Sequence, residues 1–260
     1  MSATREAVIL TACNQKGGVG KTTSAVNLAA SLAALDRRVL LVDLDPQGHA
    51  SMGSGIDKYD LEKSVLDVLL GEAKAGEVIV RGLPVHYDVL PGNGDLTAAE
   101  VELLDSDQRQ SRLSLALASV ADDYDVVLID CPPSLNMLTV NALTAAHGVL
   151  IPLQCEFYAL EGLSALLDTV EQIKQSVNPE LAVSGILRTM YDKRTSLTRE
   201  VDKQLRDFFG DALLKTTIPR NVKVAEAPSH GVPVTQYARF SRGSQAYRVL
   251  AKEMIRRLSL

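Results

Sequence analysis

Residues 16–23 read KGGVGKTT and lie between an apolar run at residues 7–12 (AVILTA) and a helical pattern at about residues 21–35. The apolar run is typical of a buried strand, so this segment forms the turn from a strand into a helix. Three glycines in four positions allow backbone conformations that other residues avoid, so successive N–H groups can face an anion. The beginning of the helix adds free N–H groups and the positive end of the helix dipole. The segment therefore predicts a loop that binds phosphate.

The side chains of this loop point to a nucleotide with magnesium. Lys21 is expected to reach the β- and γ-phosphates, the Thr22 hydroxyl to bind Mg²⁺, and Thr23 to donate to the α-phosphate. The expected nucleotide-binding residues of the loop are Lys16, Gly17, Gly18, Val19, Gly20, Lys21, Thr22 and Thr23. The ordinary pattern G-x-x-x-x-G-K-[ST] is not fully matched, because Gln15 stands where its first glycine belongs. Lys16 is a second lysine, which we expect to point away from its own loop and to reach a nucleotide on a facing subunit.

Three aspartates stand at the ends of predicted strands. Asp43 and Asp45 follow the apolar run at residues 39–42, and Asp130 ends the run VVLID at residues 126–130. Ligands of an open parallel sheet bind beyond the carboxyl ends of its strands, so all three carboxylates should lie near the phosphate loop. Asp130 fits the Walker B role of holding Mg²⁺ through water, and Asp45 that of orienting or activating the attacking water. Asp43 is expected to support the loop or the water molecules around the metal. A local turn or cap is the alternative role for Asp45 and Asp130.

The rest of the chain alternates between apolar strands and helical patterns. Further strands are expected near residues 39–42, 87–90, 126–130, 149–153 and 182–187, and helices near 64–70, 98–104, 111–120, 160–174, 197–209 and 243–258. Continuous apolar strands that alternate with helices indicate a mostly parallel sheet covered by helices on both faces. We therefore predict a doubly wound α/β fold of the P-loop NTPase type. Because no linker or break in composition interrupts the alternation, residues 1–260 are expected to form a single domain.

The composition favours a soluble, cytoplasmic protein. The chain has 260 residues, of which 46% are hydrophobic and 23% charged, and no apolar run approaches the ~18–20 residues that a membrane span needs. Residues 1–5 lack the charged and apolar regions of a signal peptide. Three cysteines without C-x-x-C spacing and four scattered histidines favour reduced thiols over a disulfide framework or a zinc site.

Charge is distributed unevenly along the chain. Residues 1–180 contain 12 Lys and Arg against 25 Asp and Glu, whereas residues 181–260 contain 15 against 7. The C-terminal third is therefore strongly basic, although the whole chain has a net charge of −5. This asymmetry suggests an anionic partner for that third, and a solvated basic face that balances an acidic one is the alternative.

The segments KGGVGKTT (16–23), VDLDPQG (42–48) and VVLIDCPPS (126–134) together resemble the ParA/Soj branch of the ParA/MinD family of deviant Walker A ATPases. The resemblance continues through IPLQCEFYALEGL (151–163), TMYDKRTSL (189–197) and IPRNVKVAEAPSHG (218–231), and so covers nearly the whole chain. It implies an ATPase that uses ATP and Mg²⁺ and forms an ATP-dependent homodimer around the nucleotides.

The resemblance also assigns roles to single residues. It implies that Lys16 contacts ATP across the dimer interface, that Lys21 and Thr22 bind phosphate and Mg²⁺, that Asp45 supports hydrolysis and that Asp130 is the Walker B acid. Pro219 and Asn221 lie where the family forms its adenine pocket.

The cellular role that the resemblance implies is segregation of chromosome or plasmid DNA. The ATP-bound dimer would bind double-stranded DNA of the nucleoid without sequence preference, and a ParB-type centromere-binding partner would stimulate hydrolysis. Arg194, Arg220 and Lys223 lie in matching segments of the basic third and are expected to contact DNA phosphates, with Arg239 and Arg242 as weaker candidates. A surface charge or a local salt bridge is the alternative for each of them.

Three other functions use the same ATPase core. A MinD-like protein would bind membranes through a basic amphipathic C-terminal helix, and the pattern at residues 243–258 fits a helix docked on the sheet at least as well. A nitrogenase-type iron protein needs cysteine ligands at positions that Cys13 and Cys131 do not match. An adaptor ATPase that positions another cellular machine is the third alternative, and DNA binding distinguishes it from a partitioning protein.

Overall fold

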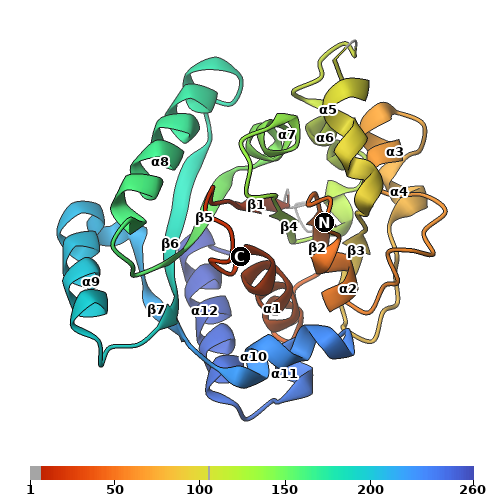
Figure 1. The fold of residues 1–260 in the computed structure, drawn as a ribbon. Coiled ribbons are helices and arrows are strands. Elements are labelled where there is room, and N and C mark those ends of the chain that lie inside the picture. The colour runs from red at the N-terminus through yellow and green to blue at the C-terminus, as the bar shows by residue number, and fades with distance from the viewer. Residues whose placement is uncertain (1–6, 105) are drawn as a thin grey trace.

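A parallel sheet forms the centre of the computed structural model, which describes residues 7–104 and 106–260 (Figure 1). Its seven strands follow the order β3-β2-β4-β1-β5-β6-β7, and neighbouring strands are parallel throughout. The strands are β1 (Val8–Ala12), β2 (Val39–Asp43), β3 (Asp88–Leu90), β4 (Val126–Asp130), β5 (Gly148–Gln154), β6 (Ala182–Tyr191) and β7 (Leu213–Pro219). The predicted doubly wound α/β fold is confirmed.

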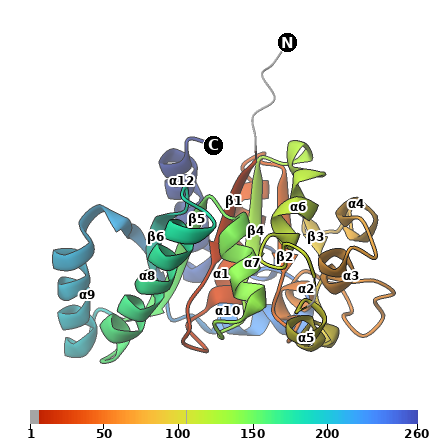
Figure 2. The ribbon, with the colours of Figure 1, turned by 90° about the horizontal axis from the view of Figure 1, so that it is seen from above.

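Helices cover both faces of this sheet, as Figures 1 and 2 show. The longer ones are α1 (Lys21–Ala33), α6 (Arg112–Ala118), α7 (Met137–Ala145), α8 (Ala159–Ser176), α9 (Ser196–Phe209) and α12 (Arg242–Leu258). The shorter ones are α2 (His49–Gly53), α3 (Val65–Leu70), α4 (Ala75–Val78), α5 (Ala99–Glu102), α10 (Val222–Glu226) and α11 (Val234–Tyr237), together with the 3₁₀ helices η1 (Gly94–Ala98), η2 (Ala121–Asp123), η3 (Gly210–Ala212) and η4 (Ala227–His230).

Alternate strand residues belong to two separate cores. In β2, Leu40 and Val42 pack in the core that contains α3, α6, α7 and α8, whereas Leu41 packs with α1 and α12. Successive side chains of a strand point to opposite faces, so an apolar residue at every position gives a sheet that is buried on both sides. This explains why the strands read as continuous apolar runs.

The structure contains elements that the sequence pattern did not predict. Strand β7 escaped prediction because Lys215 is exposed and two threonines follow it, which breaks the apolar run. Helix α7 was not predicted; it is capped by Asn136, whose Oδ1 accepts a hydrogen bond from the Thr139 N–H at 3.1 Å. The helix predicted near residues 98–104 is present as the short α5, and the 3₁₀ helix η1, which was not predicted, precedes it.

The C-terminal helix α12 is docked on the sheet. Tyr247, Leu250 and Met254 are buried in the core that α12 shares with α1. Its apolar face is therefore covered by the protein itself, as the docked alternative predicted. No helix among the described residues is both long and apolar enough to cross a membrane. The N-terminal residues 1–5, in which no signal peptide was expected, lie outside the described residues.

Candidate functional site

The glycine-rich loop lies between the carboxyl end of β1 and the beginning of α1. Gly18 (φ 75°) and Gly20 (φ 87°) adopt the left-handed conformation, which glycine reaches without a steric penalty. The Lys21 side chain is only 6% exposed, and its Nζ lies 3.5 Å from the carbonyl oxygen of Lys16. The ammonium group thus lies against the backbone of its own loop.

Lys16, the second lysine of the loop, contacts the connection that follows β5. Its Nζ lies 2.5 Å from Oε2 of Glu156, and both side chains are nearly half exposed. Such an exposed pair stabilises a fold by only about 0–1 kcal/mol, so Lys16 can exchange this partner for another anion.

Asp43 holds the segment that follows β2. Its Oδ2 accepts hydrogen bonds from the N–H and the hydroxyl of Ser51, both at 2.7 Å, and its Oδ1 accepts one from the Asp45 N–H at 3.3 Å. Burial raises the pKa of Asp43 to about 6, against the lowering effect of these donors. Asp43 therefore supports the loop that carries Asp45, as the sequence indicated.

Asp45 itself forms a turn within that loop. Its Oδ1 accepts a hydrogen bond from the Gln47 N–H at 2.9 Å, and the residue is 8% exposed. The local turn that the sequence raised as an alternative is thus present. It engages one of the two carboxylate oxygens.

Asp130 is a buried carboxylate without a hydrogen bond. Neither oxygen has a partner among the described residues, although the side chain is fully buried at the end of β4. Burial and the nearby Asp43 raise the pKa of Asp130 well above its usual range, while Thr22 and Lys21 act in the opposite direction. A buried charge of this kind is costly unless it is neutralised, so the position fits a carboxylate that faces a bound cation.

The described residues contain few side chains that could bind a metal together. No group of three metal-ligating His, Cys, Asp or Glu side chains occurs within residues 7–104 and 106–260. Mg²⁺ needs few protein ligands when substrate phosphates and water complete its shell. The three cysteines are free, as predicted, and all three are buried. A hydrogen bond with Cys131 and the nearby Lys21 ammonium lower the pKa of Cys13.

The predicted adenine-pocket residues lie at the end of β7. Pro219 is the last residue of that strand, and Asn221 caps α10 by accepting a hydrogen bond from the Val224 N–H at 3.3 Å. A cavity of about 270 Å³ adjoins Thr22 and Thr23 on one side and Ala227 and Pro228 of η4 on the other. The segment 218–231 therefore comes close to the phosphate loop.

The predicted DNA-binding residues follow β6 and β7, but two of them have acidic partners nearby. Arg194 pairs with Asp192 at 2.7 Å, and Lys223 pairs with Glu226 at 2.8 Å. Each is a local salt bridge, which the sequence suggested as the alternative to a contact with DNA phosphates. Arg220 is exposed and forms no ion pair with any residue that the structure describes.

Two residues outside the motif contact the phosphate loop and were not singled out from the sequence. Gln154 Nε2 donates to the Gly18 carbonyl at 3.2 Å, and Thr189 Oγ1 donates to the Val19 carbonyl at 2.7 Å. Both lie in segments that carry the family resemblance, which was the available signal.

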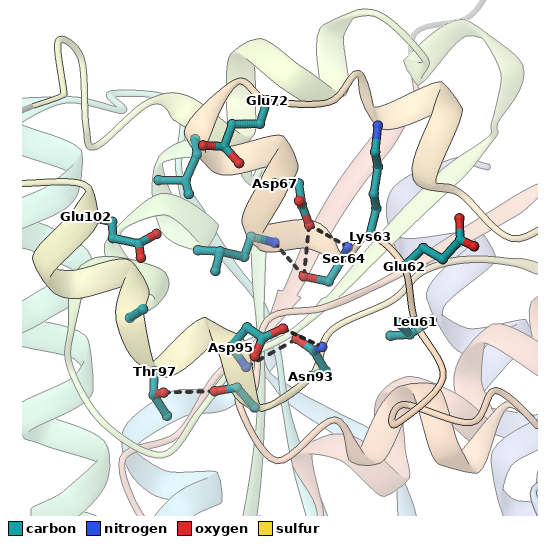
Figure 3. A pocket seen from close by; sticks show the side chains of 14 residues that line it. Leu61, Glu62, Lys63, Ser64, Asp67, Glu72, Asn93, Asp95, Thr97 and Glu102 are labelled. Carbon is teal, nitrogen blue, oxygen red and sulfur yellow. Dashed lines mark hydrogen bonds between the residues drawn. The ribbon is translucent and has the colours of Figure 1, made fainter.

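Another cavity lies between α3 and the η1–α5 segment (Figure 3). It measures about 570 Å³, and its lining includes the acidic residues Glu62, Asp67, Glu72, Asp95 and Glu102. Asp67 caps α3 by accepting a hydrogen bond from the Ser64 N–H at 2.7 Å, which gives this carboxylate a local structural role. No residue predicted for the nucleotide site lines this cavity.

Comparison with known proteins identifies relatives of this chain. A family model described as "AAA domain" matches residues 7–183. The sporulation initiation inhibitor protein Soj of Bacillus subtilis is 50% identical over 246 residues, which are 95% of this chain and 97% of that protein. The chromosome partitioning protein ParA of Caulobacter vibrioides is 50% identical over 96% of this chain and 94% of its own length.

Solved structures agree with this fold. A Mycobacterium smegmatis protein described as cobyrinic acid a,c-diamide synthase, with bound ADP and magnesium, gives a TM-score of 0.85 at 41% identity and covers 97% of this chain and 96% of its own. The cell division ATPase MinD of Pyrococcus furiosus gives 0.79 at 26% identity, over 96% of this chain and 98% of its own. Half of the residues are shared with Soj and ParA over nearly the full length, and the chain therefore belongs to the ParA/Soj branch of the ParA/MinD family.

Proposed function

We propose that this protein is a Mg²⁺-dependent ATPase that works as an ATP-driven dimerisation switch in DNA partitioning. The observation that carries the ATPase part is the position of Asp130, a buried carboxylate without a hydrogen bond beside a glycine-rich loop that ends in Lys21 and Thr22. The family membership supports the partitioning part, since the relative from Caulobacter vibrioides is described as a chromosome partitioning protein.

The phosphate loop, Asp45 and Asp130 have separate roles in the proposed reaction. Thr22 and Asp130 would hold Mg²⁺, which supplies positive charge to the phosphates when it is bound. Lys21 and the N–H groups of the loop bind the phosphate chain. Asp45 positions the attacking water and accepts its proton, because it is a carboxylate in the loop that follows β2 and only one of its oxygens is engaged by the turn.

Exposed apolar side chains at the carboxyl edge of the sheet support dimerisation. Phe157 and Tyr158 are 75% and 67% exposed and directly follow Glu156, the partner of Lys16. Leu135, in the connection after β4, is also exposed. Exposed apolar groups around a binding site are typical of protein–protein interfaces. In the proposed dimer these residues face the second subunit, and Lys16 contacts its nucleotide.

The basic C-terminal third supports DNA binding. Arg194, Arg220 and Lys223 follow the carboxyl ends of β6 and β7, the edge at which the phosphate loop also lies. Contacts from lysines and arginines to phosphates need no base recognition, so the ATP-bound dimer binds duplex DNA without sequence preference and stays on the nucleoid. A ParB-type partner stimulates hydrolysis and releases the protein from chromosome or plasmid DNA.

The alternatives are less well supported. A MinD-like membrane protein would need a free apolar helix face, and that of α12 is buried. The amide synthesis named for the Mycobacterium smegmatis protein is not proposed, because identity to it is 41% against 50% for Soj. An adaptor ATPase shares the nucleotide chemistry, and an assay of DNA binding separates it from a partitioning protein.

Replacing Lys16 with alanine tests the dimerisation switch. With Mg²⁺ and a non-hydrolysable ATP analogue, the parent protein is expected to sediment as a dimer and Lys16→Ala as a monomer that still binds the analogue. The reason is that Lys16 neutralises charge on the phosphates of the facing subunit. Analytical ultracentrifugation measures both states, and Lys63→Ala, which removes an exposed lysine that lines the cavity beside α3, is the matched control. A stable Lys16→Ala dimer would contradict the cross-subunit assignment.

A further inference from the structure

Side chains from β5 and β6 hold the phosphate loop by its carbonyl groups. Thr189, near the end of β6, donates through Oγ1 to the Val19 carbonyl at 2.7 Å. Gln154, the last residue of β5, donates through Nε2 to the Gly18 carbonyl at 3.2 Å. These contacts join two consecutive peptide groups of the loop to two neighbouring strands.

Packing does not hold the first two glycines of the loop. A Cβ atom built on Gly17 or Gly18 would meet nothing within 4 Å, whereas Val19 is buried. Glycines of this kind have wide conformational freedom, and a binding loop that must first be ordered binds more weakly. The hydrogen bonds from Thr189 and Gln154 therefore restrict the peptides of a segment in which side-chain packing holds Val19 but not Gly17 or Gly18.

Peptide geometry links these bonds to the phosphate site. In a planar trans peptide the C=O and the N–H of the same unit point in opposite directions. The bond from Gln154 therefore turns the Val19 N–H away from β5 and β6, and the bond from Thr189 does the same for the Gly20 N–H. These N–H groups are then directed to the opposite side of the loop, as in a backbone nest that binds an anion.

Thr189 lies in a buried position from which its hydroxyl can hold the Val19 carbonyl. It is 3% exposed, and its Cγ2 lies 3.8 Å from the position of a Cβ on Gly20. The hydroxyl has a single proton to donate, and the Val19 carbonyl is nearer than the second acceptor, the Leu153 carbonyl at 3.0 Å. The Gln154 amide is held in turn by Met190 Sδ, which lies 2.8 Å from Nε2.

We propose that Thr189 and Gln154 are positioning residues for the nucleotide: they fix the Gly18–Val19 and Val19–Gly20 peptides so that their N–H groups face the phosphates. The inference rests on the proposed nucleotide binding of the loop. It assigns a function to residues that lie 136 to 170 positions from the loop in the sequence.

Thr189→Val tests the proposal because valine keeps the shape and loses the hydroxyl. Without this donor the Val19 carbonyl can turn to water in the free protein, and the loop must be reordered when the nucleotide binds. We expect the Kd of Mg²⁺–ADP in isothermal titration calorimetry to rise about tenfold, and the KM for ATP to rise similarly with kcat within about twofold. Thr189→Ser, which keeps the donor, should stay within about threefold of the parent.

Two further variants separate positioning from a general effect on folding. Thr169→Val removes a buried hydroxyl that donates to the Ala165 carbonyl at 3.1 Å inside α8, far from the loop, and should leave the Kd unchanged. Gln154→Met removes the second donor at a partly exposed position, and a rise in Kd of about two- to fivefold is expected. The nucleotide-free Tm of each variant shows whether it is folded.

The outcomes distinguish this proposal from the proposed function. Parent affinity in folded Thr189→Val and Gln154→Met would overturn the positioning role, as would an equal loss in Thr169→Val. A parent protein that binds neither Mg²⁺–ADP nor Mg²⁺–ATP would instead contradict the proposed function.

Discussion

Asp45→Ala is expected to lower the rate of ATP hydrolysis by about 10²–10⁴-fold while the protein still binds Mg²⁺–ATP. The Asp45 carboxylate is proposed to orient the attacking water and take its proton, whereas the phosphate-binding groups of the loop are untouched by the substitution. Phosphate release under single-turnover conditions measures the rate, and calorimetry with a non-hydrolysable analogue measures the binding.

The matched control for this variant is Asp45→Asn. Asp45 Oδ1 accepts a hydrogen bond from the Gln47 N–H at 2.9 Å, and an asparagine oxygen can keep that turn while it cannot act as a base. If the carboxylate acts in hydrolysis, both variants are slow. Near-parent hydrolysis by Asp45→Asn would show instead that Asp45 serves only the turn.

We expect Asp130→Asn to weaken nucleotide binding and to stabilise the nucleotide-free protein. The first effect is loss of the Mg²⁺-dependent part of nucleotide binding, because the variant lacks the carboxylate proposed to face the cation. The second is a nucleotide-free protein that is more stable at pH 7 by about 1–3 kcal/mol, or ~3–8 °C in Tm, because an uncompensated buried charge has been removed.

The pH dependence of stability follows from the direction of the pKa shift. Burial and Asp43 raise the pKa of Asp130 in the folded protein, so the unfolded chain ionises at a lower pH than the folded one. The parent protein without nucleotide should therefore lose stability as the pH rises from about 4 through the raised folded pKa. Asp43, with a pKa of about 6, contributes in the same direction.

Thermal unfolding without nucleotide between pH 4.5 and 8 measures this dependence. A flatter profile for Asp130→Asn than for the parent is expected. If the parent and Asp130→Asn had the same dependence of Tm on pH and the same Tm at pH 7, Asp130 would not be a destabilising buried carboxylate that a bound cation neutralises.

The features that could be predicted from the sequence depend on residues that lie close together in the chain. The left-handed backbone at Gly18 and Gly20 and the position of Asp130 follow from glycine spacing and from a carboxylate at a strand end. The ion pairs of Arg194 with Asp192 and of Lys223 with Glu226 join residues two and three positions apart. The sequence alone could therefore suggest local salt bridges as an alternative to DNA contacts.

Contacts between distant segments explain what could not be predicted. Thr189 and Gln154 reach the phosphate loop only because β5 and β6 lie on the same side of β1 in the sheet, and no local pattern encodes that order. Strand β7 has exposed and partly exposed positions at the sheet edge, so its residues lack the apolar signal of the central strands. The proposed roles of Gln154 and Thr189 could therefore be inferred only from the three-dimensional structure.

Binding of random-sequence duplex DNA tests whether ATP controls the interaction of this protein with DNA. It is measured with Mg²⁺–ATP, with Mg²⁺–ADP and without nucleotide, each at two salt concentrations, and Asp45→Ala is included to hold the ATP state. We expect binding with ATP alone, strongest in Asp45→Ala, and a steep loss of affinity at the higher salt. Absence of DNA binding in every state, with binding to anionic vesicles instead, would contradict the partitioning switch.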